Sequence, residues 1–283
     1  MKNIIRFILI AFFSSSVNGD RLVTIGSTAT ELVFALGCGD KVVGVDQSSL
    51  HPKEVKELPQ VGYIRMISAE GILALNPSHI ITGEDIGPKE TLQKLYETNI
   101  KITIVKTPND LDSLIQCIDL LSSELSALEM AKKVKEDIEK TVSEINIPDQ
   151  EVSAIFLMHH PYTQAGLNAA GKNTKANKII ELSGGKNSID SHNGYKAISQ
   201  ESLLLLNPEY IFIGVPENIL SEEYEIIKMI SDKKIFANLE AVENNNIHVL
   251  PLSKTLSFSH KLPETIKDIS DIFSQDLKYV SDE

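Results

Sequence analysis

The sequence predicts an α/β protein of two Rossmann-like lobes joined by a single long helix, and three observations predict it. The stretch GYIRMISAEGILALNPSHIITG, residues 62–83, returns in similar form as GYKAISQESLLLLNPEYIFIG, residues 194–214. The 283 residues are too many for one small core and suit two lobes of about 120–140 residues each. Residues 121–147, between the two stretches, contain neither Gly nor Pro. Two copies at a domain-sized separation indicate two related lobes rather than a solenoid.

Each copy of the repeat predicts a helix followed at once by a buried strand. Ser68 and Ser199 are expected as helix N-caps, because a serine hydroxyl can accept from the amides of the first turn. Glu70 and Glu201 then fall in that first turn, where a negative charge suits the helix dipole. Asn-Pro ends each helix, because the residue before proline avoids helical angles. Helix, tight turn and strand together form an α/β unit.

The other elements follow the same alternation of strands and helices. In the first half we expect strands over RLVTIG, KVVGVD and IKITIV and a helix over STATELVFALG, capped at Ser27 or Thr28. In the second half we expect strands over VSAIFLM and NIHVLP and a helix over NTKANKIIELSG. The N-terminal lobe is thus predicted over residues 20–120 and the C-terminal lobe over 148–283. Apolar residues at helical spacing predict one connecting helix over 121–147, with a ligand cleft between the lobes.

The first 19 residues predict export. Lys2 and Arg6 precede the apolar run 7–13, which small residues follow, and this order is typical of a secretory signal peptide. A membrane anchor is the alternative, but the run is far shorter than the roughly 20 residues that a span requires. We expect cleavage near Asp20. Because no cysteine lies there, we expect a free soluble protein of the periplasm.

The formal charge disfavours one class of partner, and the cysteine content leaves a possible disulfide undecided. A formal charge of −12 disfavours nucleic acid, because phosphate binding requires clustered Lys and Arg. Cys38 and Cys117 are the two cysteines of the chain, and both lie in helix-like segments. In an oxidising compartment they could form a disulfide, or both could be buried free thiols.

Four segments carry a family resemblance, namely TELVFALGCGDKVVGVD, PQVGYIRMISAEGILALNPSHII, AAGKNTKANKIIELSGGKN and GYKAISQESLLLLNP. Their order resembles that of the haem-binding periplasmic proteins of bacterial ABC haem importers. These proteins belong to a class with a helical backbone that also binds cobalamin and ferric siderophores. The resemblance covers essentially the whole chain after residue 19. Its haem-specific part depends on Gly-Tyr-x-Arg followed by Ser-Ala-Glu.

The resemblance implies that Tyr63 supplies a phenolate ligand to ferric haem iron and that Arg65 supports it. The chemistry is sound, because ferric iron favours an anionic oxygen and tyrosine is an established haem ligand. A neighbouring guanidinium favours the phenolate over the neutral phenol. The alternative is that Tyr63 is a packing residue and Arg65 a surface charge.

The resemblance also implies that Glu70 and Glu201 dock the two lobes onto a two-fold symmetric permease dimer of the inner membrane. Two matching carboxylates on two lobes suit such a partner. The alternative is that Glu70 and Glu201 stabilise the first helical turn through the helix dipole and have no partner protein.

In the second lobe, some relatives use a histidine as a further haem contact. His160 is the nearest positional match, with His159 and His192 as alternates, because the first two follow a strand at its carboxyl end. Tyr195, the counterpart of Tyr63, is expected to stack on the porphyrin. A structural histidine and a packing tyrosine are the alternatives.

These features predict a carrier that takes ferric haem from an outer-membrane receptor to an ABC permease, with haem as the transported ligand. A ferric siderophore or cobalamin is the nearest alternative. The chain has no Trp, and Arg occurs only at positions 6, 21 and 65, which favours haem over a siderophore. A Zn or Mn carrier would leave Tyr63 without a role. An enzyme is disfavoured, because no acid–base constellation, GxSxG elbow or phosphate loop is found.

Overall fold

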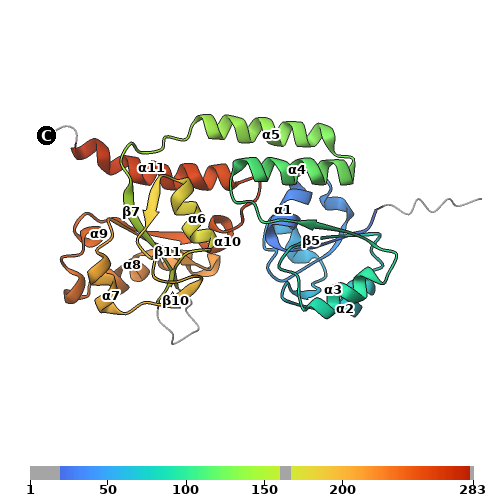
Figure 1. The fold of residues 1–283 in the computed structure, drawn as a ribbon, viewed down its shortest axis with the longest axis horizontal. Coiled ribbons are helices and arrows are strands. Elements are labelled where there is room, and N and C mark those ends of the chain that lie inside the picture. The colour runs from blue at the N-terminus through green and yellow to red at the C-terminus, as the bar shows by residue number, and fades with distance from the viewer. Residues whose placement is uncertain (1–19, 160–166, 281–283) are drawn as a thin grey trace, which may run out of the picture.

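The computed structural model describes residues 20–159 and 167–280. The two lobes lie side by side, and helices extend along one side of both (Figure 1). The signal peptide expected over residues 1–19 and the candidate His160 lie outside the described residues. In the part of the chain that is described, no helix is long and apolar enough to cross a membrane.

The N-terminal lobe contains a four-stranded parallel sheet in the order β2-β1-β5-β6. All four residues of β1 are buried, as expected of a parallel strand covered on both faces. Its strands are β1 (Leu22–Ile25), β2 (Val42–Val45), β5 (His79–Gly83) and β6 (Lys101–Val105), and its helices are α1 (Ser27–Ala35), α2 (Ala69–Leu73), α3 (Lys89–Tyr96) and α4 (Leu111–Leu125). A separate hairpin joins β3 (Gly62–Tyr63) to β4 (Met66–Ile67). Short 3-10 turns lie at Gly39–Lys41 and Lys53–Glu57.

The C-terminal lobe contains a six-stranded mixed sheet in the order β10-β8-β7-β11-β12, with β9 also paired to β7. Its strands are β7 (Val152–His159), β8 (Leu167–Ala170), β9 (Gly185–Asn187), β10 (Tyr195–Ala197), β11 (Tyr210–Val215) and β12 (Ile247–Pro251). Its helices are α6 (Lys175–Leu182), α7 (Gln200–Leu206), α8 (Glu223–Ser231), α9 (Glu240–Glu243), α10 (Leu252–Thr255) and α11 (Leu262–Val280), with 3-10 turns at Glu217–Glu222 and Lys234–Phe236.

The repeat forms the expected unit twice, as α2 followed by β5 and as α7 followed by β11. The hydroxyl of Ser68 accepts from the amide of Gly71, and that of Ser199 accepts from Ser202. Both helices are therefore capped as predicted. Asn76 and Asn207 adopt left-handed angles, with φ of 47° and 37°. The turn before each strand thus depends on asparagine, which tolerates this conformation, as well as on the following proline.

The expected helix over residues 121–147 was wrong, because the chain reverses at Ser126. Helix α4 ends at Leu125, and α5 (Leu128–Ser143) lies alongside it (Figure 1). Ser126 has a φ of 56°, and the amides of Ser126 and Ala127 both donate to the carbonyl of Ser122. This is a left-handed helix terminus of the Schellman type. Residues 121–125 therefore belong to α4, and α5 is the part of the predicted helix that leads on toward the C-terminal lobe.

The cap expected for α1 was also wrong. Gly26 is its N-cap and gives no side-chain hydrogen bond. The hydroxyl of Thr28 donates instead to the carbonyl oxygen of Ser257, at 2.6 Å. Thr28, which we expected to cap α1, therefore contacts a segment 229 residues further along the chain.

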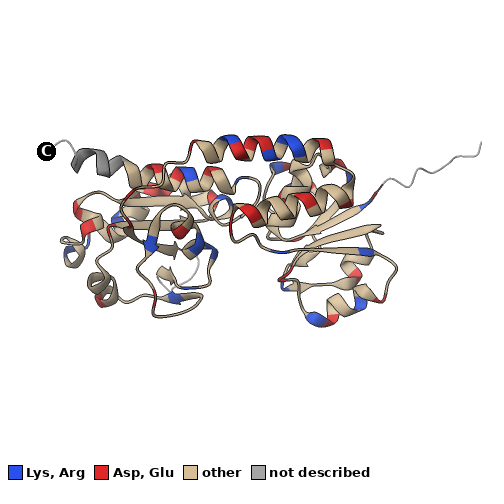
Figure 2. Ribbon diagram, turned by 45° about the horizontal axis from the view of Figure 1, so that its top comes forward, with Lys and Arg blue, Asp and Glu red and all other residues tan. Residues whose placement is uncertain are grey.

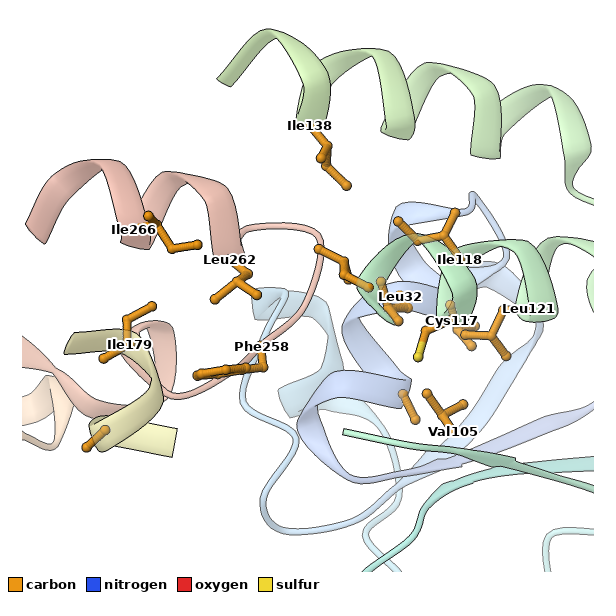
Figure 3. Packing of buried hydrophobic residues seen from close by; sticks show 14 of the residues in the cluster. Leu32, Val105, Cys117, Ile118, Leu121, Ile138, Ile179, Phe258, Leu262 and Ile266 are labelled. Carbon is orange, nitrogen blue, oxygen red and sulfur yellow. The ribbon is translucent and has the colours of Figure 1, made fainter. Parts of the chain in front are cut away.

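One buried apolar cluster extends from the N-terminal lobe through α5 to α11 and α6. Figure 3 shows Leu32 and Ile118 on one side of it and Leu262 and Ile179 on the other, with Phe258 between the lobes. The lobes therefore share a core at their junction. Cys38 and Cys117 are free thiols inside this cluster, and burial raises the pKa of both. Acidic and basic residues are interspersed along α5 (Figure 2).

Candidate ligand-binding cleft

A cleft lies between the lobes and consists of two adjoining cavities of about 640 and 200 Å³. Asp85, Thr107 and Lys175 line both. The N-terminal lobe contributes the loops that follow β5 and β6, and the C-terminal lobe contributes the start of α6. The carboxyl ends of parallel strands therefore form one wall, which is where open α/β sheets bind ligands.

Tyr63 lies in this cleft, at the end of β3. Gly62 before it has a φ of 110°, a conformation that favours glycine. The hairpin is fixed on two sides, since the amide of Gln47 donates to the Gly62 carbonyl at 2.8 Å and that of Gly87 donates to Ile64 at 2.9 Å. Tyr63 is 45% exposed and lines the smaller cavity. Its hydroxyl makes no hydrogen bond with the described residues, so it is available to a ligand.

Arg65 follows on the same hairpin and lines the same cavity. Its guanidinium pairs with the carboxylate of Asp85 at 3.3 Å, and the two side chains are 67% and 62% exposed. An exposed pair of this kind contributes about 0–1 kcal/mol. Among the described contacts, Arg65 binds Asp85 rather than the hydroxyl of Tyr63. The structure thus brings Tyr63 and Arg65 to one cavity without joining them.

Lys175 is a cleft residue that sequence reasoning missed. It is the first residue of α6, after the N-cap Thr174, and it lines both cavities. Its Nζ lies 5.6 Å from the centre of the Phe258 ring. Burial lowers the pKa of Lys175, and the more distant carboxylates of Asp85 and Glu31 act in the opposite direction. The segment AAGKNTKANKIIELSGGKN predicts helix α6. No local pattern in it shows that the first side chain of that helix, Lys175, lines the cleft.

None of the described second-lobe candidates, namely His159, His192 and Tyr195, lines the two cavities. His159 ends β7 opposite Leu167, and the ring of His192 lies 3.3 Å from the carbonyl oxygen of Ala169. Neither histidine is among the described residues that line the two cavities.

Tyr195 lies in β10, where burial raises the pKa of its phenol. Its hydroxyl bonds with the side chain of Thr174 and the backbone of Ala176, which act in the opposite direction. Thr174 and Ala176 stand on either side of Lys175. The contact seen for Tyr195 is therefore one that holds the start of α6 in place.

Glu70 and Glu201 occupy equivalent places on α2 and α7, at the ends of the lobes away from α5 (Figure 1). Both are exposed. The backbone amide of Glu70, then Lys94 and Ser68, lower the pKa of the Glu70 carboxyl, and its ion pair with Lys94 measures 3.2 Å. The backbone amide of Glu201 and then Ser199 lower the pKa of Glu201. The two carboxylates are ionised and accessible to a partner.

A bare transition metal finds no site in the part of the chain that the structure describes, since no three His, Cys, Asp or Glu side chains are grouped to hold one. The polar groups of the cleft come instead as single side chains spread over two walls. Such an arrangement suits an extended ligand that contacts several of them at once.

Comparison with known proteins agrees with this architecture. A vitamin B12-binding protein of Vibrio parahaemolyticus is 26% identical over 217 residues, 75% of this chain and 78% of that protein. An uncharacterized ABC transporter substrate-binding lipoprotein of Bacillus subtilis is 25% identical over 198 residues, which are 68% of this chain and 62% of the relative, less than two thirds of its length. The crystal structure of the periplasmic heme-binding protein HutB of Vibrio cholerae is 27% identical, with a TM-score of 0.75, and covers 90% of this chain and 98% of HutB.

The sequence pattern of the family described as "Periplasmic binding protein" matches residues 22–253, well over half of the chain. The matched region includes both copies of the repeat, helix α5 and every residue that lines the smaller cavity. The two-lobed α/β fold with an interlobe cleft is the fold that we predicted from the repeat. The chain belongs to the periplasmic binding protein family.

Proposed function

We propose that this protein binds ferric haem in the periplasm and delivers it to an ABC permease of the inner membrane. The observation that carries the proposal is the position of Tyr63, whose unbonded hydroxyl lines the interlobe cavity. A phenolate oxygen is a suitable ligand for ferric iron, and tyrosine ligates haem iron in other proteins. The similarity to HutB, described as a heme-binding protein, supports the same ligand.

The volume and mixed lining of the cleft support this proposal. The larger cavity, of about 640 Å³, falls within the range of about 300–1,000 Å³ that is usual for ligand pockets. Ile64 and Val105 give apolar surface to the smaller cavity, and Phe258 gives it to the larger. These side chains would contact the porphyrin face while Tyr63 binds the metal.

Arg65 has a supporting role in this proposal. Its pair with Asp85 is exposed, so little free energy is lost when the guanidinium turns toward another anion. A phenolate formed at Tyr63, two residues earlier on the hairpin, is such an anion. A nearby guanidinium would lower the pKa of the phenol and so favour the iron-bound form.

Delivery would use the two carboxylates that the repeat places on the lobes. Glu70 and Glu201 are exposed at equivalent sites, which suits a permease with two-fold symmetry. This role and the periplasmic location rest on the family and on the signal peptide expected from the sequence. A binding protein of this kind performs no catalytic step.

Cobalamin is the second candidate, favoured by the similarity to the vitamin B12-binding protein. The two ligands are separable by titration. We expect ferric haem, and not cyanocobalamin, to bind the purified protein and to give an absorption spectrum of the tyrosinate type. Tyr63→Phe should change that spectrum and weaken binding.

Tyr96→Phe is the matched control, since Tyr96 is an exposed tyrosine on α3 that lines neither cavity. It should leave the spectrum and the affinity unchanged. An unchanged spectrum in Tyr63→Phe would remove Tyr63 as the ligand. Binding of cyanocobalamin alone would establish the second candidate.

A further inference from the structure

We propose that Lys175 binds a carboxylate at the rim of the ligand, so that the C-terminal lobe recognises the acidic edge while the N-terminal lobe binds the metal. This inference rests on the function proposed above and names the chemical class of the ligand more closely. It assigns a role to a side chain that enters the cleft from the lobe opposite Tyr63.

The backbone that carries Lys175 is firmly held. The hydroxyl of Thr174 donates to the carbonyl of Gly171 at 2.8 Å and accepts from the amide of Asn177 at 3.0 Å. The hydroxyl of Tyr195 bonds to groups on both sides of Lys175. The ammonium therefore extends into the cleft from a fixed base, which limits the entropy lost when a ligand binds.

Lys175 differs from the other cations of the cleft in having no counter-ion. Three cationic side chains line the two cavities among the described residues, namely Arg65, Lys175 and Lys178. Arg65 pairs with Asp85 at 3.3 Å, and Lys178 pairs with Glu181 at 3.4 Å. No described carboxylate lies within ion-pair distance of Lys175.

A desolvated cation without a partner is the kind of group that gains most from an incoming anion. Burial lowers the pKa of Lys175, because the charged form loses water at this place. Hydrogen bonds between an ammonium and a carboxylate are about twice as strong as neutral ones. The positive end of the α6 dipole adds a charge of the same sign.

The chemistry of the two candidate ligands differs at this position. A haem carries two ionised carboxylates at one edge and a ferric ion at its centre, whereas the side chains at the rim of cobalamin are mainly neutral amides. A half-buried ammonium with no described carboxylate beside it would favour the carboxylate edge. The ring of Phe258, 5.6 Å from Nζ, supplies the apolar surface beside it.

The test compares ferric haem with its dimethyl ester, in which both carboxylates are neutral. In Lys175→Met, haem affinity should fall about ten- to hundredfold, and affinity for the ester should change less than about twofold. Lys172→Met is the matched control, because Lys172 is an exposed lysine three residues earlier that lines neither cavity. It should leave both affinities near those of the parent.

Two results of the Lys175→Met titrations would contradict a contact between Lys175 and a carboxylate of the ligand. Equal losses for haem and ester in Lys175→Met would assign Lys175 to packing, and no loss for either would exclude any contact; both results overturn the inference. Failure of the parent protein to bind either probe would reject the proposed function itself. Should Lys175→Met fold poorly in thermal denaturation, Lys175→Gln and Lys175→Arg replace it: only the arginine variant should retain the preference for haem over its ester.

Discussion

The carboxylate of Glu31 accepts a hydrogen bond of 2.7 Å from the hydroxyl of Ser257, 226 residues further along the chain. Its second oxygen accepts from Ser259, also at 2.7 Å. Glu31 belongs to α1 of the N-terminal lobe, whereas the serines lie in the segment between α10 and α11. All three are buried, and Phe258 between the serines has a φ of 51°. One carboxylate thus fastens the C-terminal part of the chain to the first lobe.

Replacing Glu31 with alanine should destabilise the fold. The change leaves two buried hydroxyls without an acceptor, at about 1–3 kcal/mol each, so we expect a loss of about 2–6 kcal/mol. Urea unfolding at neutral pH measures it. Glu57→Ala, at an exposed position, should change stability by less than about 0.5 kcal/mol. Equal effects of the two substitutions would contradict the role of Glu31.

Stability should fall on mild acidification because of His260. Burial, assisted by Lys261, lowers the pKa of His260 to about 4, whereas an unfolded histidine titrates near 6.5. The unfolded chain therefore binds the proton first, and stability is lost as the pH falls from about 6.5 toward 4. Between pH 7.5 and 5.0 the loss due to this group is about 2 kcal/mol.

The variant His260→Leu should reduce this dependence on pH. Some slope should persist, because burial also lowers the pKa of His79. The measurement is urea unfolding at the two pH values, above the range in which most carboxylates titrate. If the difference between pH 7.5 and 5.0 is the same with and without His260, that histidine does not carry the effect.

Ser126→Gly should stabilise the protein by about 0.5–1 kcal/mol. The left-handed φ of 56° at Ser126 disfavours any residue with a β-carbon, and glycine removes that cost. Ser123→Gly provides a control with the opposite sign, because the same change within α4 should destabilise by about 0.5 kcal/mol. Thermal unfolding of both variants shows whether the signs differ. A destabilised Ser126→Gly protein would mean that the chain reverses in some other way.

The double variant Glu70→Ala, Glu201→Ala should slow permease-coupled haem transport and leave haem affinity unchanged. Both carboxylates are exposed and line neither cavity, so we expect ligand binding not to depend on them. Each single variant should lose part of the transport. Glu90→Ala with Glu223→Ala, which removes two other exposed carboxylates, is the control. A silent double variant would exclude docking through these residues.

The repeat made much of the fold predictable. The serine caps of α2 and α7, the first-turn glutamates and the following strands depend on neighbours in the sequence, so local patterns identified them. The helix over 121–147 was wrong for a related reason. Gly and Pro are the usual signs of an interruption, and Ser126 adopts a left-handed conformation without either.

The cleft was predictable only in part. Tyr63 and Arg65 stand in a short motif, and the structure places both in the wall of the smaller cavity. Lys175 and Glu31 were missed, because their importance depends on what the other lobe places beside them. No sequence pattern around Glu31 predicts its contact with Ser257. No local pattern shows that Lys175 has no carboxylate within ion-pair distance.

The ion pair between Glu70 and Lys94 makes the two ends of the molecule electrically unequal. Lys94 already compensates Glu70, whereas no described cation lies within ion-pair distance of Glu201. On the docking proposed above, a permease with two identical half-sites would meet a compensated carboxylate on one lobe and an uncompensated one on the other.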